Sequence, residues 1–306
     1  MGVMDPSRFP NLASPAVLRA LLESRGIRPN RVLGQNFLID RNIVNIILDA
    51  ADLAGSDRVL EVGPGAGVLT LDLVQRAGRV LAVEKDHGLA GLLTDLAGGC
   101  ANLEIRQADV LELDPGRTVT PQIDKVVSNL PYATGGRILV ELTCRRSPPE
   151  RLVVTVQAEV GDRLAGEAGD RARGTLGVWI QLRYHVERIK RVRPTCFWPR
   201  PDVQSVVVRL MRRIQPLLDS CLESRFYDLT RKAFQHRRKQ MERVLNDLGG
   251  DGRGLMQAAG IDPRLRPEAL AMDDWCRLAA VLGPLPATCG QPGMNGNDRE
   301  GSLECT

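Results

Sequence analysis

The residues with the clearest chemical potential form a glycine-rich turn, EVGPGAG, at positions 61–67. An apolar run at 58–62 before the turn predicts a buried strand, and the stretch 66–76 after it predicts a helix. Glycines at such a turn let a ligand approach the backbone, and the start of the helix offers free N–H groups. We therefore expect Gly63 and Gly65 to line a ligand site.

The spacing of the glycines separates two classes of cofactor. The dinucleotide fingerprint G-x-G-x-x-G would need a glycine at position 68, where the sequence has Val68. The third glycine is Gly67, and the E-x-G-x-G-x-G form resembles motif I of the S-adenosylmethionine methyltransferases. S-adenosylmethionine is therefore the expected cofactor, and a NAD-linked oxidoreductase is disfavoured. A tight turn without a ligand is the alternative interpretation of this motif alone.

Two acidic residues follow the next two expected strands, 79–84 and 102–107. Glu84 ends the first strand, about 20 residues after the turn, where its carboxylate could accept both ribose hydroxyls. Asp109 follows the second strand, where it could accept from the exocyclic amine of the cofactor adenine. Singly, each would more simply be a solvated acid at a strand end. Together with the turn they stand at the carboxyl ends of successive strands, where open α/β sheets bind ligands.

A second motif, NLPY at 129–132, follows the expected strand 125–129 and has the groups needed to hold an adenine. The Asn129 side-chain oxygen and the Leu130 carbonyl could accept the two N–H bonds of an adenine N6 amine, which directs its lone pair at a sulfonium methyl. Pro131 makes the turn rigid, and Tyr132 could stack on an extruded base. Taken alone, the motif could also be an ordinary proline-containing turn.

Further motifs give the chain a resemblance to the KsgA-type ribosomal RNA adenine dimethyltransferases between about residues 28 and 282. GQNFL at 34–38 is similar to the family's N-terminal motif, which closes over the cofactor. EVGPGAGVLT at 61–70 resembles its motif I, and NLPY resembles its motif IV. FWPRPDV at 197–203 resembles motif VIII, whose phenylalanine stacks on the target base. RRKQ and AAGIDPRLRPEAL, at 237–240 and 258–270, are similar to its helical C-terminal domain.

The resemblance implies a set of site residues. The residues that would contact the cofactor are Asn36, Leu38, Gly63, Gly65, Glu84, Asp109 and Asn129. The residues that would form the catalytic site and hold the adenine are Asn129, Leu130, Pro131, Tyr132 and Phe197. Phe197 could instead be a core aromatic, but its proline-flanked setting favours a position at the rim. Residues 133–136, Lys85 and Gln204 depart from the family's usual sequence, so the number of methyl groups added is left open.

Strand and helix patterns alternate along most of the chain, which predicts an α/β fold with a Rossmann-like methyltransferase sheet. A segment at 203–213 is expected to close this sheet, and only helical patterns, at 221–248, 253–260 and 267–282, follow. The expected domains are an N-terminal lead and helix (1–27), a methyltransferase domain (28–216), a small all-helical RNA-binding domain (217–283) and a disordered tail (284–306).

The charge pattern indicates an RNA partner. The net charge is only +4, but arginines and lysines cluster between about 188 and 243, which is typical of a phosphate-binding surface, although a solvated helix face would look similar. Seven scattered cysteines without a C-x-x-C pair, and three histidines, predict neither a metal site nor a disulfide framework. No apolar run of about 18 residues and no signal peptide is evident, so we expect a cytoplasmic protein. We also expect it to be a monomer.

The sequence therefore predicts S-adenosylmethionine-dependent N6-dimethylation of adenines in small-subunit ribosomal RNA, linked to biogenesis of that subunit. One alternative is a resistance-type methyltransferase acting on large-subunit ribosomal RNA. Another is a non-catalytic ribosome-assembly or transcription factor that uses the same fold, although the intact glycine turn, Glu84 and NLPY argue against it.

Overall fold

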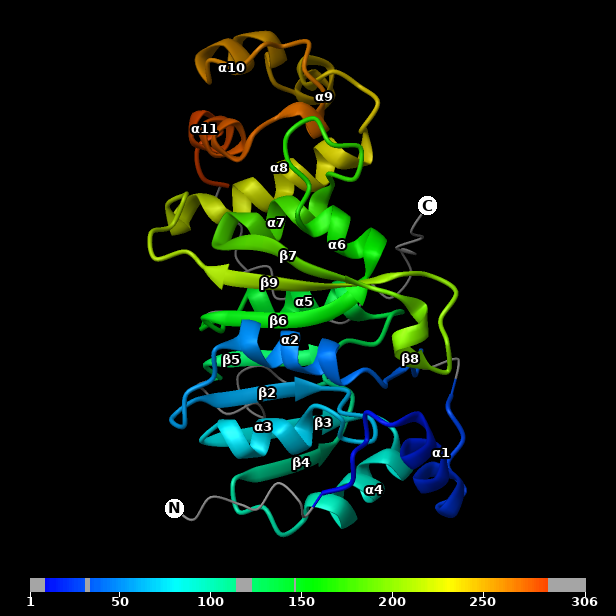
Figure 1. The fold of residues 1–306 in the computed structure, drawn as a ribbon. Coiled ribbons are helices and arrows are strands. Elements are labelled where there is room, and N and C mark those ends of the chain that lie inside the picture. The colour runs from blue at the N-terminus through cyan, green and yellow to red at the C-terminus, as the bar shows by residue number, and fades with distance from the viewer. Residues whose placement is uncertain (1–8, 31–33, 114–122, 146, 286–306) are drawn as a thin grey trace. The chain divides into compact units, whose positions relative to one another are not determined.

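A computed structural model describes residues 9–30, 34–113, 123–145 and 147–285 (Figure 1). The chain divides after Leu217 into two compact units, the first α/β and the second helical. Residues 1–8 of the expected lead and 286–306 of the expected tail lie outside the described residues. No helix among the described residues is long and apolar enough to cross a membrane.

A seven-stranded sheet in the order β4-β3-β2-β5-β6-β9-β7 forms the centre of the first unit. Its strands are β2 (Arg58–Val62), β3 (Arg79–Glu84), β4 (Leu103–Gln107), β5 (Lys125–Asn129), β6 (Arg151–Gln157), β7 (Tyr184–Val192) and β9 (Ser205–Arg212). The first five are parallel, and β9 lies antiparallel between β6 and β7. The strand order reverses between β2 and β5, and such a switch point leaves a ligand-binding crevice at the carboxyl ends of the strands.

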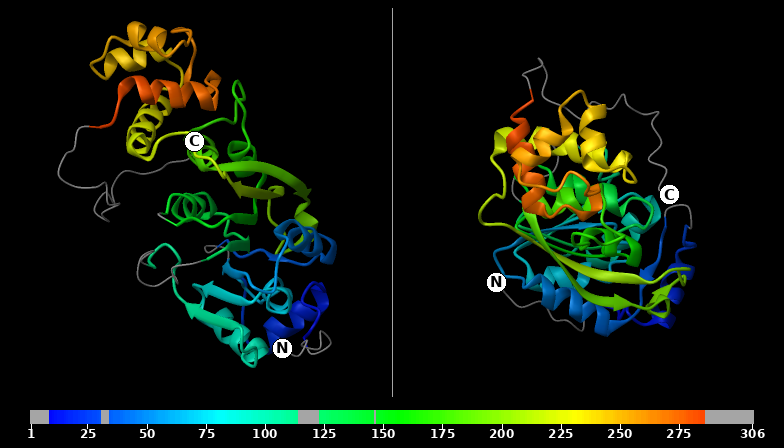
Figure 2. Two further views of the ribbon diagram at one scale, coloured as in Figure 1. Left: turned by 90° about the vertical axis from the view of Figure 1, so that its left-hand side faces the viewer. Right: turned by 90° about the horizontal axis from the view of Figure 1, so that it is seen from above.

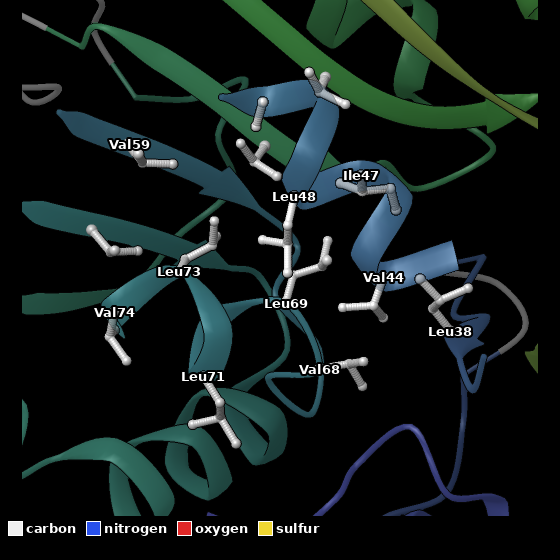
Figure 3. Packing of buried hydrophobic residues seen from close by; sticks show 14 of the residues in the cluster. Leu38, Val44, Ile47, Leu48, Val59, Val68, Leu69, Leu71, Leu73 and Val74 are labelled. Carbon is white, nitrogen blue, oxygen red and sulfur yellow. The ribbon is translucent and has the colours of Figure 1, made fainter. Parts of the chain in front are cut away.

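Helices cover both faces of this sheet, as the left view of Figure 2 shows. The helices of this unit are α1 (Pro15–Ser24), α2 (Arg41–Ala51), α3 (Thr70–Arg76), α4 (His87–Ala97), α5 (Gly135–Thr143), α6 (Ala158–Leu164) and α7 (Thr175–Arg183), and α1 packs with α4. Successive side chains of a strand point to opposite faces, so β2 supplies Val59 to one core and Leu60 to the other. Val59 belongs to the same buried cluster as Ile47 and Leu48 of α2 (Figure 3).

The expected strands 58–62, 79–84 and 125–129 are confirmed as β2, β3 and β5. The helix expected from residue 66 begins only at Thr70, because Gly67 adopts a φ of 95° that a helix does not allow. The segment 203–213 forms β9 inside the sheet, so the expectation that it closes the edge is wrong. β7 forms that edge of the sheet instead. The sequence pattern does not predict β7, because a bulge between Arg188 and Lys190 breaks the alternation of apolar and polar residues.

The second unit packs short helices around buried Phe226, Trp275 and Leu278. Its elements are η3 (Ser220–Leu222), α8 (Glu223–Gln235), α9 (Met241–Asp247), α10 (Gly252–Ala258), η4 (Pro267–Ala269) and α11 (Met272–Leu282). The expectation of a single helix over 221–248 is therefore wrong, because residues 236–240 between α8 and α9 are not helical. The helix expected over 267–282 is likewise divided into η4 and α11.

Candidate functional site

The glycine turn lies at the carboxyl end of β2, beside the switch point. Gly63, Gly65 and Gly67 have φ angles of 65°, 59° and 95°, in the left-handed region that favours glycine. A Cβ on Gly65 would lie 3.0 Å from the Phe37 ring, and one on Gly63 would lie 3.5 Å from Pro131. The turn is thus approached closely by the GQNFL and NLPY motifs, and any side chain added to it would fill the space between them.

Glu84 joins the end of β3 to the glycine turn. Its carboxylate accepts the N–H of Gly65 at 2.9 Å on one oxygen and the N–H of Asp86 at 2.8 Å on the other. The residue is buried, and this burial raises the pKa of its carboxyl despite the two backbone donors. Each carboxylate oxygen has a second acceptor position, so Glu84 retains the capacity for the ribose hydroxyls predicted from the sequence.

Glu61 is a buried acid to which the sequence analysis gave no role of its own. Thr70 Oγ1 donates to Glu61 Oε2 at 2.6 Å. The pair therefore connects the end of β2 to the first residue of α3 across the glycine turn. The pKa of Glu61 is raised to about 8, chiefly by burial. The hydrogen bond from Thr70 acts to lower it, and the charge of Glu84 acts to raise it. Nothing in the motif itself indicates this contact, which depends on the folded turn.

The raised pKa of Glu61 makes the stability of the protein depend on pH. Between its ordinary value of 4.5 and about 8, the folded protein holds a proton that the unfolded chain has released. The free energy of unfolding is therefore expected to fall as the pH rises through this range, by up to about 1.4 kcal/mol per pH unit. Glu61→Gln keeps an acceptor for Thr70 and should remove this slope in urea unfolding curves. Glu23→Gln, at an exposed position on α1, should keep it; parallel profiles for wild type and Glu61→Gln would contradict the assignment.

Asp109 lies beyond β4 and is already engaged by two donors. Lys85 Nζ contacts one carboxylate oxygen at 2.9 Å, and the N–H of Leu111 donates to the other at 2.9 Å. Burial raises the pKa of Asp109, but these donors and the charge of Lys85 outweigh it and leave the pKa below its ordinary value. The predicted acceptor for the cofactor adenine is thus an ionised carboxylate that shares one oxygen with Lys85.

Asn129 ends β5 on the other side of the switch point. Its Nδ2 donates to the backbone carbonyl of Asn36 at 2.9 Å, which links the NLPY and GQNFL motifs. This leaves Asn129 Oδ1 buried without a hydrogen-bond partner among the described residues. Leaving a buried acceptor unpaired costs about 1–3 kcal/mol. Such an atom at the carboxyl end of β5 is suited to a ligand that donates an N–H.

The aromatic residues of the predicted site meet through a small two-stranded sheet. The strands β1 (Phe37–Leu38) and β8 (Phe197–Trp198) pair antiparallel, with Leu38 opposite Phe197. Phe197 also contacts Tyr132 edge to face, with ring centroids 6.4 Å apart. The expected rim position of Phe197 is wrong, because the pairing with β1 encloses its ring and leaves it 2% exposed. The side chain of Leu38 belongs to the same buried cluster.

A model of the ribosomal RNA adenine dimethylase family matches residues 27–283. The chain belongs to this family. It is 39% identical over 286 residues to ribosomal RNA small subunit methyltransferase A of Pelotomaculum thermopropionicum, covering 88% of this chain and 96% of the relative. It is 37% identical over 280 residues to the protein of the same name from Staphylococcus aureus, covering 88% and 94%. The resemblance inferred from the motifs is therefore confirmed.

Solved structures of similar proteins support the adenine dimethylase fold. The 23S rRNA methyltransferase ErmE has a TM-score of 0.67 and 28% identity over 81% of this chain and 99% of its own. A dimethyladenosine transferase from Plasmodium falciparum has a TM-score of 0.70 and 24% identity over 79% and 95%. These similarities confirm the expected Rossmann-like methyltransferase sheet.

The segment at 133–136, which the sequence resemblance marks as a departure from the family pattern, follows the NLPY turn directly. The carbonyl of Pro131 accepts the N–H of Thr134 at 3.3 Å and that of Gly135 at 2.8 Å, so the NLPY turn leads directly into α5. A Cβ on Gly135 would lie 3.4 Å from the Cβ of Leu130. The start of α5 is therefore hydrogen-bonded to the NLPY turn, and it packs against Leu130.

Proposed function

We propose that this adenine dimethylase transfers methyl groups from S-adenosylmethionine to the N6 amines of adenines in small-subunit ribosomal RNA. The observation that carries the proposal is the unpartnered Oδ1 of Asn129, held at the switch point beside the glycine turn. The names of the two relatives, which share more than a third of this sequence, support the small subunit as the substrate.

The residues at the switch point fit S-adenosylmethionine. The three left-handed glycines leave backbone room at the carboxyl end of β2, and Glu84 is fixed where a ribose would lie in a sheet of this kind. Asp109 stands one strand further, as a carboxylate suited to the adenine amine. When bound, the cofactor supplies an electrophilic methyl group on a sulfonium centre. Asn36, Leu38, Gly63, Gly65 and Asn129 complete the proposed binding set.

The NLPY turn would hold the target amine. Asn129 Oδ1 and the Leu130 carbonyl accept its two N–H bonds, which opposes delocalisation of the nitrogen lone pair into the ring and orients it for transfer. The rigid Pro131 fixes these acceptors relative to each other. Tyr132 would contact a face of the extruded base. Phe197, whose ring is buried, would support the Tyr132 ring edge to face. The methylated ammonium is acidic enough to lose its proton to water.

Asp109 and Lys85, which form an ion pair, are expected to contribute differently to the affinity for S-adenosylmethionine. Asp109→Ala should raise the dissociation constant for S-adenosylmethionine about tenfold, because it removes a charged hydrogen-bond acceptor. Lys85→Met should change it by less than about threefold, since an exposed ion pair contributes little. Isothermal titration calorimetry measures both. If Lys85→Met weakens binding more than Asp109→Ala, then Lys85, and not Asp109, contacts the cofactor.

We propose RNA contacts for exposed basic residues in both units, and a monomer in the cytoplasm as the acting form. Part of the basic clustering is neutralised, since Arg188 and Arg191 pair with Asp162, and Lys232 pairs with Asp228. Exposed basic residues without an ion-pair partner among the described residues include Lys190, Arg193, Arg200, Arg238 and Arg243. These remain available to RNA phosphates.

The subunit preference separates the proposal from a large-subunit, resistance-type activity. Purified small and large ribosomal subunits, both undermethylated, would be incubated separately with the enzyme and radiolabelled S-adenosylmethionine. The proposal expects label in the RNA of the small subunit. Label confined to the RNA of the large subunit would favour the alternative and contradict the proposal.

A further inference from the structure

We propose that Ser205 is a positioning residue that fixes the ring of Tyr132 for adenine binding. This inference rests on the proposed function. Tyr132 belongs to the NLPY turn, and Ser205 is the first residue of β9, 73 residues later in the chain. Their hydroxyl oxygens lie 2.6 Å apart, which is a hydrogen bond between the proposed adenine site and the sheet.

Ser205 provides a rigid point of attachment. It lies opposite Gln157 of β6 and opposite Val192 of β7, so its backbone is held by strands on both sides. Its exposed fraction is 0%. Tyr132, in contrast, lies in the loop between β5 and α5. The hydroxyl contact therefore transfers the rigidity of the sheet to a loop side chain.

Tyr132 is held at two points of its ring. The hydroxyl end contacts Ser205, and the ring meets Phe197 edge to face at 6.4 Å and 77°. Phe197 is itself fixed by the pairing of β8 with β1. Ordering a side chain on binding costs about 0.5–1.5 kcal/mol, so a ring that is ordered beforehand spares the RNA complex this cost. Burial raises the pKa of Tyr132, which keeps its hydroxyl protonated.

A double-mutant cycle tests whether the two hydroxyls act together. Tyr132→Phe keeps the aromatic ring and removes its hydroxyl, and Ser205→Ala removes the partner. Each single variant should lower kcat/KM for the small ribosomal subunit about fivefold, the value of a typical hydrogen bond. The double variant should also lose about fivefold, because the same contact is removed. Ser205→Thr should restore much of the rate, and the dissociation constant for S-adenosylmethionine should stay unchanged throughout.

A spectroscopic measurement follows the contact without relying on activity. The chain has three tyrosines, at 132, 184 and 227, so a protein labelled with carbon-13 at the tyrosine Cζ atoms gives a simple spectrum. Ser205→Ala should shift the signal of Tyr132 and leave the other two in place. Thr143→Val removes a buried hydroxyl that contacts Leu139 and should leave all three unchanged.

The outcomes are distinct. A shifted Tyr132 signal together with a non-additive loss of kcat/KM supports the positioning role. Losses that multiply to about 25-fold in the double variant, or a wild-type rate in Ser205→Ala, would overturn it. An unshifted Tyr132 signal would overturn it as well. A wild-type protein that binds the subunit and methylates nothing would instead contradict the proposed function, while the carbon-13 signal would still decide whether the contact exists.

Discussion

Asn129→Ala is expected to lower the rate of methyl transfer about a thousandfold. The substitution removes the buried oxygen that we assign to the target amine, and losing one fixed polar group at a reacting centre typically costs a hundredfold to a thousandfold. It also removes the hydrogen bond to the Asn36 carbonyl, which connects two motifs of the site. Single-turnover transfer of labelled methyl groups to undermethylated small subunits measures the effect.

A matched control exists for this substitution. Asn102 also has a buried side-chain oxygen with no partner in the described part of the chain, and its Nδ2 donates to the carbonyls of Val74 and Ala77. Asn102→Ala should lower the free energy of unfolding and leave the rate per folded molecule unchanged. Equal transfer rates in the two variants would show that Asn129 has only a structural role.

Gly65→Ala is expected to weaken S-adenosylmethionine binding about a hundredfold. The new Cβ would lie 3.0 Å from the Phe37 ring, on the surface that we assign to the cofactor. Overpacking of this kind costs about 1–3 kcal/mol. The free protein can relieve it by moving the Phe37 ring away from the turn, whereas the complex would have to bear it, so the upper part of that range corresponds to the expected loss. Equilibrium binding to the purified variant measures it.

The control for Gly65 separates backbone strain from ligand contact. Gly26 has a φ of 64°, close to the 59° of Gly65, but a Cβ there would have no atom within 4 Å. Gly26→Ala should therefore carry a similar strain of about 1–2 kcal/mol and bind the cofactor as the wild type does. If Gly65→Ala binds S-adenosylmethionine as tightly as Gly26→Ala, the cofactor does not lie against the turn.

Much of the sheet could be predicted because its central strands have a simple pattern. β2, β3 and β5 are short apolar runs bounded by glycine or polar residues, and their predicted limits match the structure. The pattern fails at β7, where apolar residues at 184 and 186 are followed by one at 189. The bulge between Arg188 and Lys190 shifts the pairing with β9 by one residue. The alternation of apolar and polar residues along the sequence is therefore broken at this point.

The sequence could indicate candidate site residues that belong to a motif with recognisable chemical groups. It could not indicate contacts between residues that are far apart in the chain. The glycine turn, Glu84 and Asn129 were identified from residue type and spacing. The burial of Phe197 depends on the pairing of β8 with β1, about 160 residues away in the chain. The contact of Thr70 with Glu61 and that of Ser205 with Tyr132 likewise form only in the folded protein.

The identity of the methylated nucleoside tests most directly whether the protein dimethylates adenines in small-subunit ribosomal RNA. The wild-type protein would be incubated with labelled S-adenosylmethionine and undermethylated small ribosomal subunits, and the RNA would be digested and analysed by mass spectrometry. The proposed function predicts N6,N6-dimethyladenosine. The absence of any methylated adenosine, from a protein shown to bind both the cofactor and the subunit, would contradict it.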